Sequence, residues 1–185
     1  PARYGGLELD YGAQTMFARE LGRACASSAW VGGILACHGW MAGMLPDEAQ
    51  AEIWSDNADV AVSTSFLPID VKVEHKGDIL NISGRWRFSS GVDHCRWAIV
   101  LVIVLPENGE GPPDPVFAMI DLNECLIEAT WNSAGLAGTG SNDIVVASAN
   151  IPPHRMMRVM SLRGEETAGS KANDSYLYRL PLFAV

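Results

Sequence analysis

The chain has 185 residues, of which 48% are hydrophobic and 19% are charged, and its formal net charge is −9. This apolar content excludes a disordered chain, and 22 acidic against 13 basic residues argue against a surface that binds nucleic-acid phosphates. No stretch reaches the roughly 17 apolar residues that a membrane-spanning helix needs, so we expect no membrane contact.

The first part of the chain is predicted to be helical. Apolar positions between residues 11 and 26 recur near the helical period. A second helix follows, capped by Ser27 or Ser28 and running to about Met44, and its nearly all-apolar sequence predicts burial on most sides. Pro46 and the acidic pair that follows it predict a short third helix through Trp54.

From about residue 59 the hydrophobic period changes to two, which is typical of strands. Residues 69–73 and 80–88 predict two strands joined by a hairpin turn, with Gly77 at positive φ. The apolar run 98–105 predicts a central strand, and 116–120, 125–131 and 143–150 predict further strands. The polar stretches 106–115 and 163–174 predict loops. These elements indicate an α+β fold in which N-terminal helices precede an antiparallel β-barrel or sandwich.

The cysteines and the start of the chain bear on the compartment. Four scattered cysteines form no C-x-x-C pair and are interpreted as small apolar residues, not as a disulfide framework or a zinc site. We therefore expect no bound metal. No basic-then-apolar signal peptide is found, so we expect a cytoplasmic protein.

Common catalytic and phosphate-binding motifs are absent from the sequence. It contains no P-loop, no H-E-x-x-H metal motif and no G-x-S-x-G nucleophile elbow. A strand-like sequence follows the glycine-rich segment 135–141, which disfavours a dinucleotide-binding Rossmann fingerprint. Two interpretations of this segment stay open. It is either a loop whose amides, Thr139 and Ser141 approach a ligand, or a surface turn.

Two further patterns suggest a binding site. Residues 84–97, GRWRFSSGVDHCRW, alternate aromatic residues with arginines and then reach a Ser-Ser-Gly corner. Such a corner suits a flat polar ring, although a strand end with core aromatics explains the same pattern. In the second helix Trp30 and His38 lie eight residues apart, about 12 Å along the axis. His38 is either an acid–base residue with a pKa near working pH or a buried, satisfied histidine.

Three segments together resemble the acyl-CoA dehydrogenase superfamily: PARYGG, GRWRFSSGVDHCRW and WNSAGLAGTGSNDIVVASANIPPHR, in that order. Within it the chain is most similar to the flavin-dependent monooxygenase branch, which includes p-hydroxyphenylacetate hydroxylase and a steroid-pathway phenol hydroxylase. The resemblance covers nearly the whole chain. It implies the end of a helical domain over residues 1–56 and a flavin-contacting β-barrel over 57–162. It also implies that 163–185 begin a C-terminal four-helix bundle, which is absent, so that the chain is part of a longer, tetrameric enzyme.

The same resemblance implies an oxygenase component that hydroxylates a small phenolic substrate through a flavin C4a-hydroperoxide. Oxygen and FMNH2 or FADH2 from a separate reductase would take part. His38 and Ser89 take catalytic roles by this resemblance, and Trp30, His38 and Thr64 contact substrate. The implied flavin contacts are Trp86, Phe88, Ser89, Ser90, Gly91, Gly138, Thr139 and Ser141. Two alternatives stay open, namely an acyl-CoA dehydrogenase-type oxidoreductase and a non-catalytic interaction module.

Overall fold

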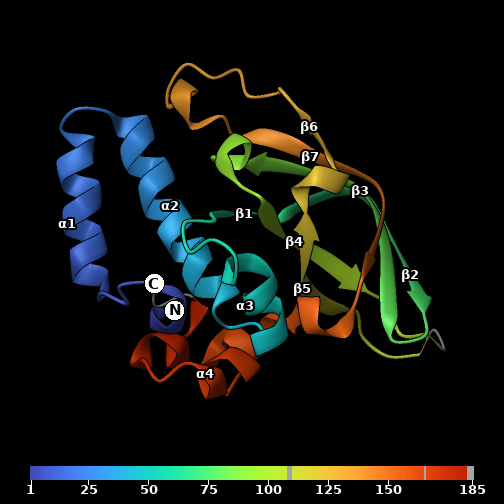
Figure 1. The fold of residues 1–185 in the computed structure, drawn as a ribbon. Coiled ribbons are helices and arrows are strands. Elements are labelled where there is room, and N and C mark those ends of the chain that lie inside the picture. Colours follow the sequence, from blue (N-terminus) through green and yellow to red (C-terminus); the bar gives the residue numbers. More distant parts are fainter. Residues whose placement is uncertain (108–109, 165, 183–185) are drawn as a thin grey trace.

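The computed structural model of the chain describes residues 1–107, 110–164 and 166–182. Its elements form three layers, in which a helical layer covers one face of an inner sheet and an outer sheet covers the other (Figure 1). The inner sheet has the strand order β1-β4-β5-β8, and the outer sheet has the order β2-β3-β7-β6. The predicted α+β class is confirmed, with the strands arranged as a sandwich.

The three predicted helices are present. The α-helices are α1 (Tyr11–Gly22), α2 (Ala26–Ala42), α3 (Asp47–Trp54) and the short α4 (Ala168–Ala172). The predicted serine cap is wrong, because α2 already begins at Ala26 and no side chain caps it. Burial on most sides is also wrong for this helix, since its buried residues all lie from His38 onward and Trp30 is 49% exposed.

The six strands predicted from the periodicity appear in the predicted order with shifted ends, and the described residues contain two further strands, β1 and β8. They are β1 (Val62–Ser65), β2 (Leu67–Lys76), β3 (Ile79–Ser89), β4 (Trp97–Val104), β5 (Asp114–Asp121), β6 (Leu126–Glu128), β7 (Asn142–Ile151) and β8 (Met156–Arg158). Gly77 in the β2–β3 turn has φ of +63°, as predicted. The all-antiparallel expectation fails at one pair, because β1 runs parallel to β4. Residues 108–109 of the predicted loop 106–115 lie outside the described residues.

Strand β4 explains why its sequence is an uninterrupted apolar run. Its alternate residues Trp97 and Ile99 pack against the helical layer, whereas Ala98, Val100 and Val102 pack between the two sheets. A strand that is buried on both faces needs apolar residues at every position. The inner sheet therefore forms the middle of the molecule, and the helices and the outer sheet are positioned against it.

The C-terminal segment packs onto the helical layer. The predicted loop 163–174 contains helix α4, which a capping box at Thr167 and Ser170 begins. Gly169 donates its amide to the Met44 carbonyl at 3.0 Å, and a Cβ on Gly169 would lie 2.0 Å from the Gly43 oxygen. Only glycine permits this approach. Residues 183–185, the end of the predicted third domain, lie outside the described residues.

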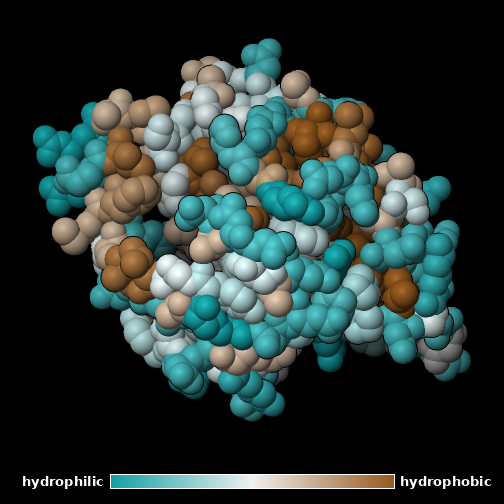
Figure 2. All heavy atoms as spheres, viewed as in Figure 1, coloured by the Kyte–Doolittle hydropathy of each residue, from teal (hydrophilic) through white to brown (hydrophobic). Residues whose placement is uncertain are grey.

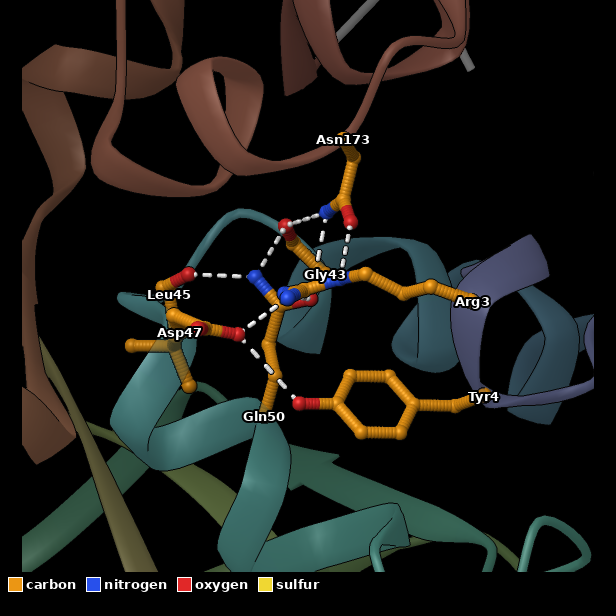
Figure 3. Close-up of polar contacts among 7 residues, drawn as sticks. All are labelled: Arg3, Tyr4, Gly43, Leu45, Asp47, Gln50 and Asn173. Atoms are coloured by element: carbon orange, nitrogen blue, oxygen red, sulfur yellow. Dashed lines mark hydrogen bonds and ion pairs between the residues drawn. The ribbon is translucent and has the colours of Figure 1, made fainter.

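A polar network joins both ends of the described chain to the turn between α2 and α3 (Figure 3). The side chain of Gln50 is fully buried and donates to the carbonyls of Gly43 at 3.0 Å and Leu45 at 2.6 Å. Its oxygen accepts from Arg3 at 2.7 Å and from Asn173 at 3.1 Å. Every polar atom of this buried amide is paired, so the network fixes the turn that ends α2.

We expect Gln50→Leu to lower the free energy of unfolding by about 3 kcal/mol, because it removes four hydrogen bonds and leaves the Leu45 carbonyl and the Arg3 Nη2 donor without these partners, whereas Asn173 still donates to the Gly43 carbonyl. Urea unfolding measures this loss. The matched control is Lys171→Ala in α4, which removes an exposed ion pair to Glu166 and should cost at most about 1 kcal/mol. Equal losses in the two variants would contradict a special role for the network.

The surface near α1 carries several exposed apolar side chains, among them Leu7, Leu9, Met16 and Phe17. Figure 2 shows apolar atoms among hydrophilic ones on this side of the molecule. None of the helices in the described part of the chain is both long and apolar enough to span a membrane. The four cysteines are free thiols, as the sequence predicts.

Candidate functional site

The predicted Ser-Ser-Gly corner lies at the end of strand β3. Phe88 has φ of +62° and Gly91 has φ of +71°, so the chain reverses between them. Left-handed backbone is unusual for an aromatic residue, so the surrounding structure must hold Phe88 in this conformation. It also corrects the predicted alternation. Trp86 is fully buried, whereas Phe88 turns away from the core and is 43% exposed.

Helix α2 touches this corner directly. A Cβ on Gly91 would lie 3.0 Å from Cγ1 of Val31, so a larger residue would push the helix away. The close approach lets the indole of Trp30 donate to the Ser90 hydroxyl at 3.0 Å. One of the two predicted site residues on α2 is thereby joined to the predicted flavin corner.

The other predicted site residue on α2, His38, is joined to the same corner through strand β1. Its Nε2 lies 2.8 Å from the Thr64 hydroxyl, and the Ser89 hydroxyl donates to the Thr64 carbonyl at 3.1 Å. All three side chains are buried. The edge strand β1 therefore brings together His38, Thr64 and Ser89, which are 26 and 25 residues apart in sequence.

Burial controls the charge of His38. Loss of solvent lowers the pKa of the imidazole to about 4, and the backbone of Val62 opposes this only in part. The predicted pKa near working pH is thus corrected, and the ring is neutral at neutral pH. Its Nδ1 is buried and has no hydrogen-bond partner within the described part of the chain.

The glycine-rich loop packs against the corner as well. Its Thr139 carbonyl accepts the Gly91 amide at 2.9 Å, and the Ser141 hydroxyl lies 2.9 Å from that of Ser90. A Cβ on Gly138 would lie 3.2 Å from Cβ of Ser27, so this loop also borders α2. The structure therefore brings the predicted residues of the loop, the corner and α2 into contact.

One feature of this loop disfavours an anion-binding nest. The Asp93 carboxylate accepts from the Asn142 amide at 3.0 Å and lies 3.0 Å from the place of a Cβ on Gly140. A carboxylate that packs against the loop backbone disfavours a phosphate on the same amides. Of the interpretations that the sequence leaves open, the loop thus fits close packing and neutral contacts better than phosphate binding.

Trp86 lies differently from the other predicted flavin contacts. It is fully buried between the sheets, and its indole donates to the Leu101 carbonyl at 2.7 Å. It supports the corner from the core between the two sheets and does not line the corner's surface.

Sequence reasoning missed Trp131 and Arg87. Both contact the ring of Phe88. The Trp131 ring packs edge-on against it with 5.9 Å between the ring centroids, and the Arg87 guanidinium lies 4.5 Å from its centroid. Trp131 was assigned to a predicted strand, but β6 ends at Glu128 and leaves Trp131 in the loop. The alternation of arginines with aromatics was the available signal for Arg87.

A pocket of about 440 Å³ lies between α1, α2 and the segment that precedes α1. Leu35 and Val62, which are close in sequence to the predicted site residues, line this pocket. Trp30, His38 and Thr64 do not line it. The predicted substrate-binding residues are therefore outside this pocket. The described residues contain no group of three or more His, Cys, Asp and Glu that is arranged to hold a metal ion.

Comparison with known proteins gives relatives of one kind. No family model matches the chain. The chain is 33% identical over 184 residues to the oxygenase component of an FADH2-dependent resorcinol hydroxylase from Rhizobium, covering 98% of this chain and 44% of the relative. It is 31% identical to the oxygenase subunit HsaA of a flavin-dependent monooxygenase from Mycobacterium tuberculosis, covering 98% and 45%.

A solved structure extends this similarity to the fold. The crystal structure of the 3-HSA hydroxylase from Rhodococcus superimposes with a TM-score of 0.89 at 30% identity, over 98% of this chain and 46% of that one. The chain has the fold of these hydroxylases over the part that it spans. It spans about half the length of the curated relatives that it matches.

Because His38 is buried, we expect the free energy of unfolding of this chain to fall at acid pH. The folded pKa of about 4 lies below the ordinary 6.5, so the unfolded chain binds more protons between these values. Stability from His38 is complete above pH 6.5 and is lost as the pH falls toward 4. We expect a loss of about 2 kcal/mol between neutral pH and about pH 5, measured by urea unfolding.

The control is His38→Gln, which keeps a polar side chain without this titration. The variant should lose less stability over the same pH interval. Parallel pH profiles in the two proteins would show that His38 does not carry the effect.

Proposed function

We propose that this chain is part of the oxygenase component of a two-component flavin-dependent monooxygenase that hydroxylates a phenolic ring. One observation carries the proposal: His38, Thr64 and Ser89 are linked at a buried corner in a chain that is similar to such hydroxylases over 98% of its length. Relatives named for resorcinol and p-hydroxyphenylacetate support a phenol as the substrate class.

The residues present fit a reduced flavin. The corner offers an exposed aromatic ring at Phe88 and a partly buried hydroxyl at Ser90, with the fully buried Ser89 hydroxyl beneath them. A flat ring with N–H and C=O groups needs this combination of stacking and hydrogen bonding. The flavin, FMNH2 or FADH2, would supply electrons to oxygen for the insertion of one oxygen atom. In the proposal Gly138 borders the flavin, the buried Thr139 and Ser141 lie behind the corner, and Trp86 supports it.

Ser89 would serve as a hydrogen-bond acceptor. Its hydroxyl proton is donated to the Thr64 carbonyl, so the remaining lone pairs of Oγ accept from an N–H on the ring. A fixed, buried acceptor orients the ring and excludes water from its reactive edge.

His38 and Thr64 would bind the phenol. The buried imidazole is neutral, so one ring nitrogen accepts a proton while the Thr64 hydroxyl holds Nε2. Trp30, on the same face of α2, would border the aromatic ring of the substrate. A hydrogen bond from the phenol to the neutral His38 would orient the ring and raise the electron density of the carbon that is attacked.

The remainder of the enzyme would complete this site. In the proposal residues 1–56 end a helical domain, 57–162 form the flavin-contacting domain, and 163–185 lead into a C-terminal helix bundle. The complete protein would be a cytoplasmic homotetramer that receives reduced flavin from a separate reductase. Relatives described as oxygenase components or subunits support the need for a second protein.

The test uses the complete protein, reduced flavin, oxygen and a set of simple phenols. Hydroxylated product that requires both reduced flavin and oxygen would support the proposal. Anaerobic bleaching of bound oxidised flavin by an acyl-CoA, with no phenol product, would instead identify an acyl-CoA dehydrogenase. Absence of any flavin binding would identify an interaction module.

Ser89→Ala should increase the hydrogen peroxide released per reduced flavin consumed, because the ring loses its buried acceptor. Loss of one such hydrogen bond corresponds to about a fivefold change in the ratio of peroxide to product. Peroxide and product are both quantified in single-turnover reactions. The control is Ser148→Ala on β7, a surface serine. An unchanged peroxide fraction in Ser89→Ala would remove Ser89 from this role.

His38→Ala should lower the hydroxylation rate about a hundredfold and leave the affinity for reduced flavin near the wild-type value. The imidazole contacts the phenol in the proposal, not the flavin. Rates are measured by stopped flow and affinity by anaerobic titration. Normal product yield at every pH would refute the role of His38.

A further inference from the structure

Four side chains form a continuous hydrogen-bond chain from the half-exposed face of α2 into the core of the glycine-rich loop. The Trp30 indole nitrogen lies 3.0 Å from the Ser90 hydroxyl, which lies 2.9 Å from that of Ser141. The Ser141 hydroxyl lies 2.7 Å from that of Thr139, and Thr139 donates to the Leu136 carbonyl at 3.0 Å. Burial increases along the chain, from Trp30 at 49% exposure to Ser141 at 4% and Thr139 at 2%.

The two ends of this chain set its direction. An indole N–H can only donate, and a backbone carbonyl can only accept. The single arrangement that pairs every proton runs from Trp30 to Ser90, on to Ser141, then to Thr139 and finally to Leu136. Hydrogen bonds that run in one direction polarise and strengthen one another. The three hydroxyls therefore act as one unit whose outer terminus holds the Trp30 ring.

We propose that Ser90, Ser141 and Thr139 are positioning residues that hold Trp30 in place, and that Ser141 and Thr139 influence the reaction through Trp30 instead of through contact with the cofactor. The effect of these three residues on substrate binding rests on the proposed function, whereas their positioning of Trp30 does not. A long indole on an exposed helix face has several rotamers, and a hydrogen bond at Nε1 selects one of them.

The surroundings of the chain support this assignment over direct cofactor binding. Ser141 and Thr139 are almost fully buried by protein atoms, and their protons are used within the chain. The Asp93 carboxylate beside Gly140 repels the phosphate end of a flavin. Trp30 is the one member of the chain that presents a large open surface to a ligand.

The first test needs no ligand. Ultraviolet resonance Raman difference spectra between wild type and Trp30→Phe isolate the indole of Trp30, whose N–H band reports its hydrogen bond. We expect the band to shift strongly in Ser90→Ala, less in Ser141→Ala and least in Thr139→Val. Ser133→Ala, a hydroxyl of the same loop that bonds only the Gly135 carbonyl, is the matched control and should leave the band unchanged.

An unshifted Trp30 band in Ser90→Ala would overturn the proposal, and so would equal shifts in Ser141→Ala and Ser133→Ala. Because this measurement is made without flavin or substrate, a failure of the proposed monooxygenase activity does not affect it. Thermal unfolding of each variant confirms that a spectral change is not general unfolding.

The second test separates positioning from cofactor contact in the complete enzyme. Ser141→Ala should raise the substrate KM about fivefold, the effect of one neutral hydrogen bond, and leave the Kd for reduced flavin unchanged. In the Trp30→Phe background the same change should have no further effect on KM, because phenylalanine cannot donate. Ser141→Thr, which keeps the hydroxyl, should restore KM. A weakened flavin Kd that persists in Trp30→Phe would overturn the proposal.

Discussion

The contact between helix α2 and the corner at Gly91 is the constraint on which the candidate site depends. Gly91 has a left-handed backbone, which favours glycine, and a Cβ there would lie 3.0 Å from Val31 of the helix and require it to shift by a few tenths of an ångström. Because the helix lies this close, Trp30 reaches Ser90 by a side-chain bond. A helix displaced by even one ångström would lose that bond, since hydrogen bonds weaken steeply with distance and angle.

The layered core explains why this contact is held in place. Helix α2 ends at a turn whose carbonyls are bound by the buried Gln50, and its last residues pack on the inner sheet. Strand β1 extends that sheet by parallel pairing with β4, which places Thr64 between His38 and Ser89. The site is thus built where an edge strand, a strand corner and a helix meet, and each of the three is anchored in a core that is packed on both faces.

The sequence indicated the elements well, because periodicity reports on secondary structure, although the apolar sequence of α2 wrongly predicted burial of its first turns. The run around Ile99 predicted a central strand, since only a strand buried on both faces lacks polar residues. Local patterns did not report on backbone reversal or on partners distant in sequence. Phe88 looked like one more inward residue of an alternating strand, yet its φ of +62° sends it outward. Helix α4 was missed because its stability depends on its capping box and on packing against Gly43, neither of which has a periodic signal.

The ionisation of the site follows from the same packing. His38 is neutral because burial penalises its charge, and the Ser89 hydroxyl linked to it through Thr64 donates its proton to the Thr64 carbonyl. A neutral, hydrogen-bonded wall suits a reaction in which water must be kept from a reduced ring. Yet Trp30 and Phe88 remain about half exposed, so the described residues form only one wall of such a pocket. In the proposed enzyme the opposite wall must come from surfaces beyond these residues, and those surfaces must be apolar enough to complete the exclusion of water.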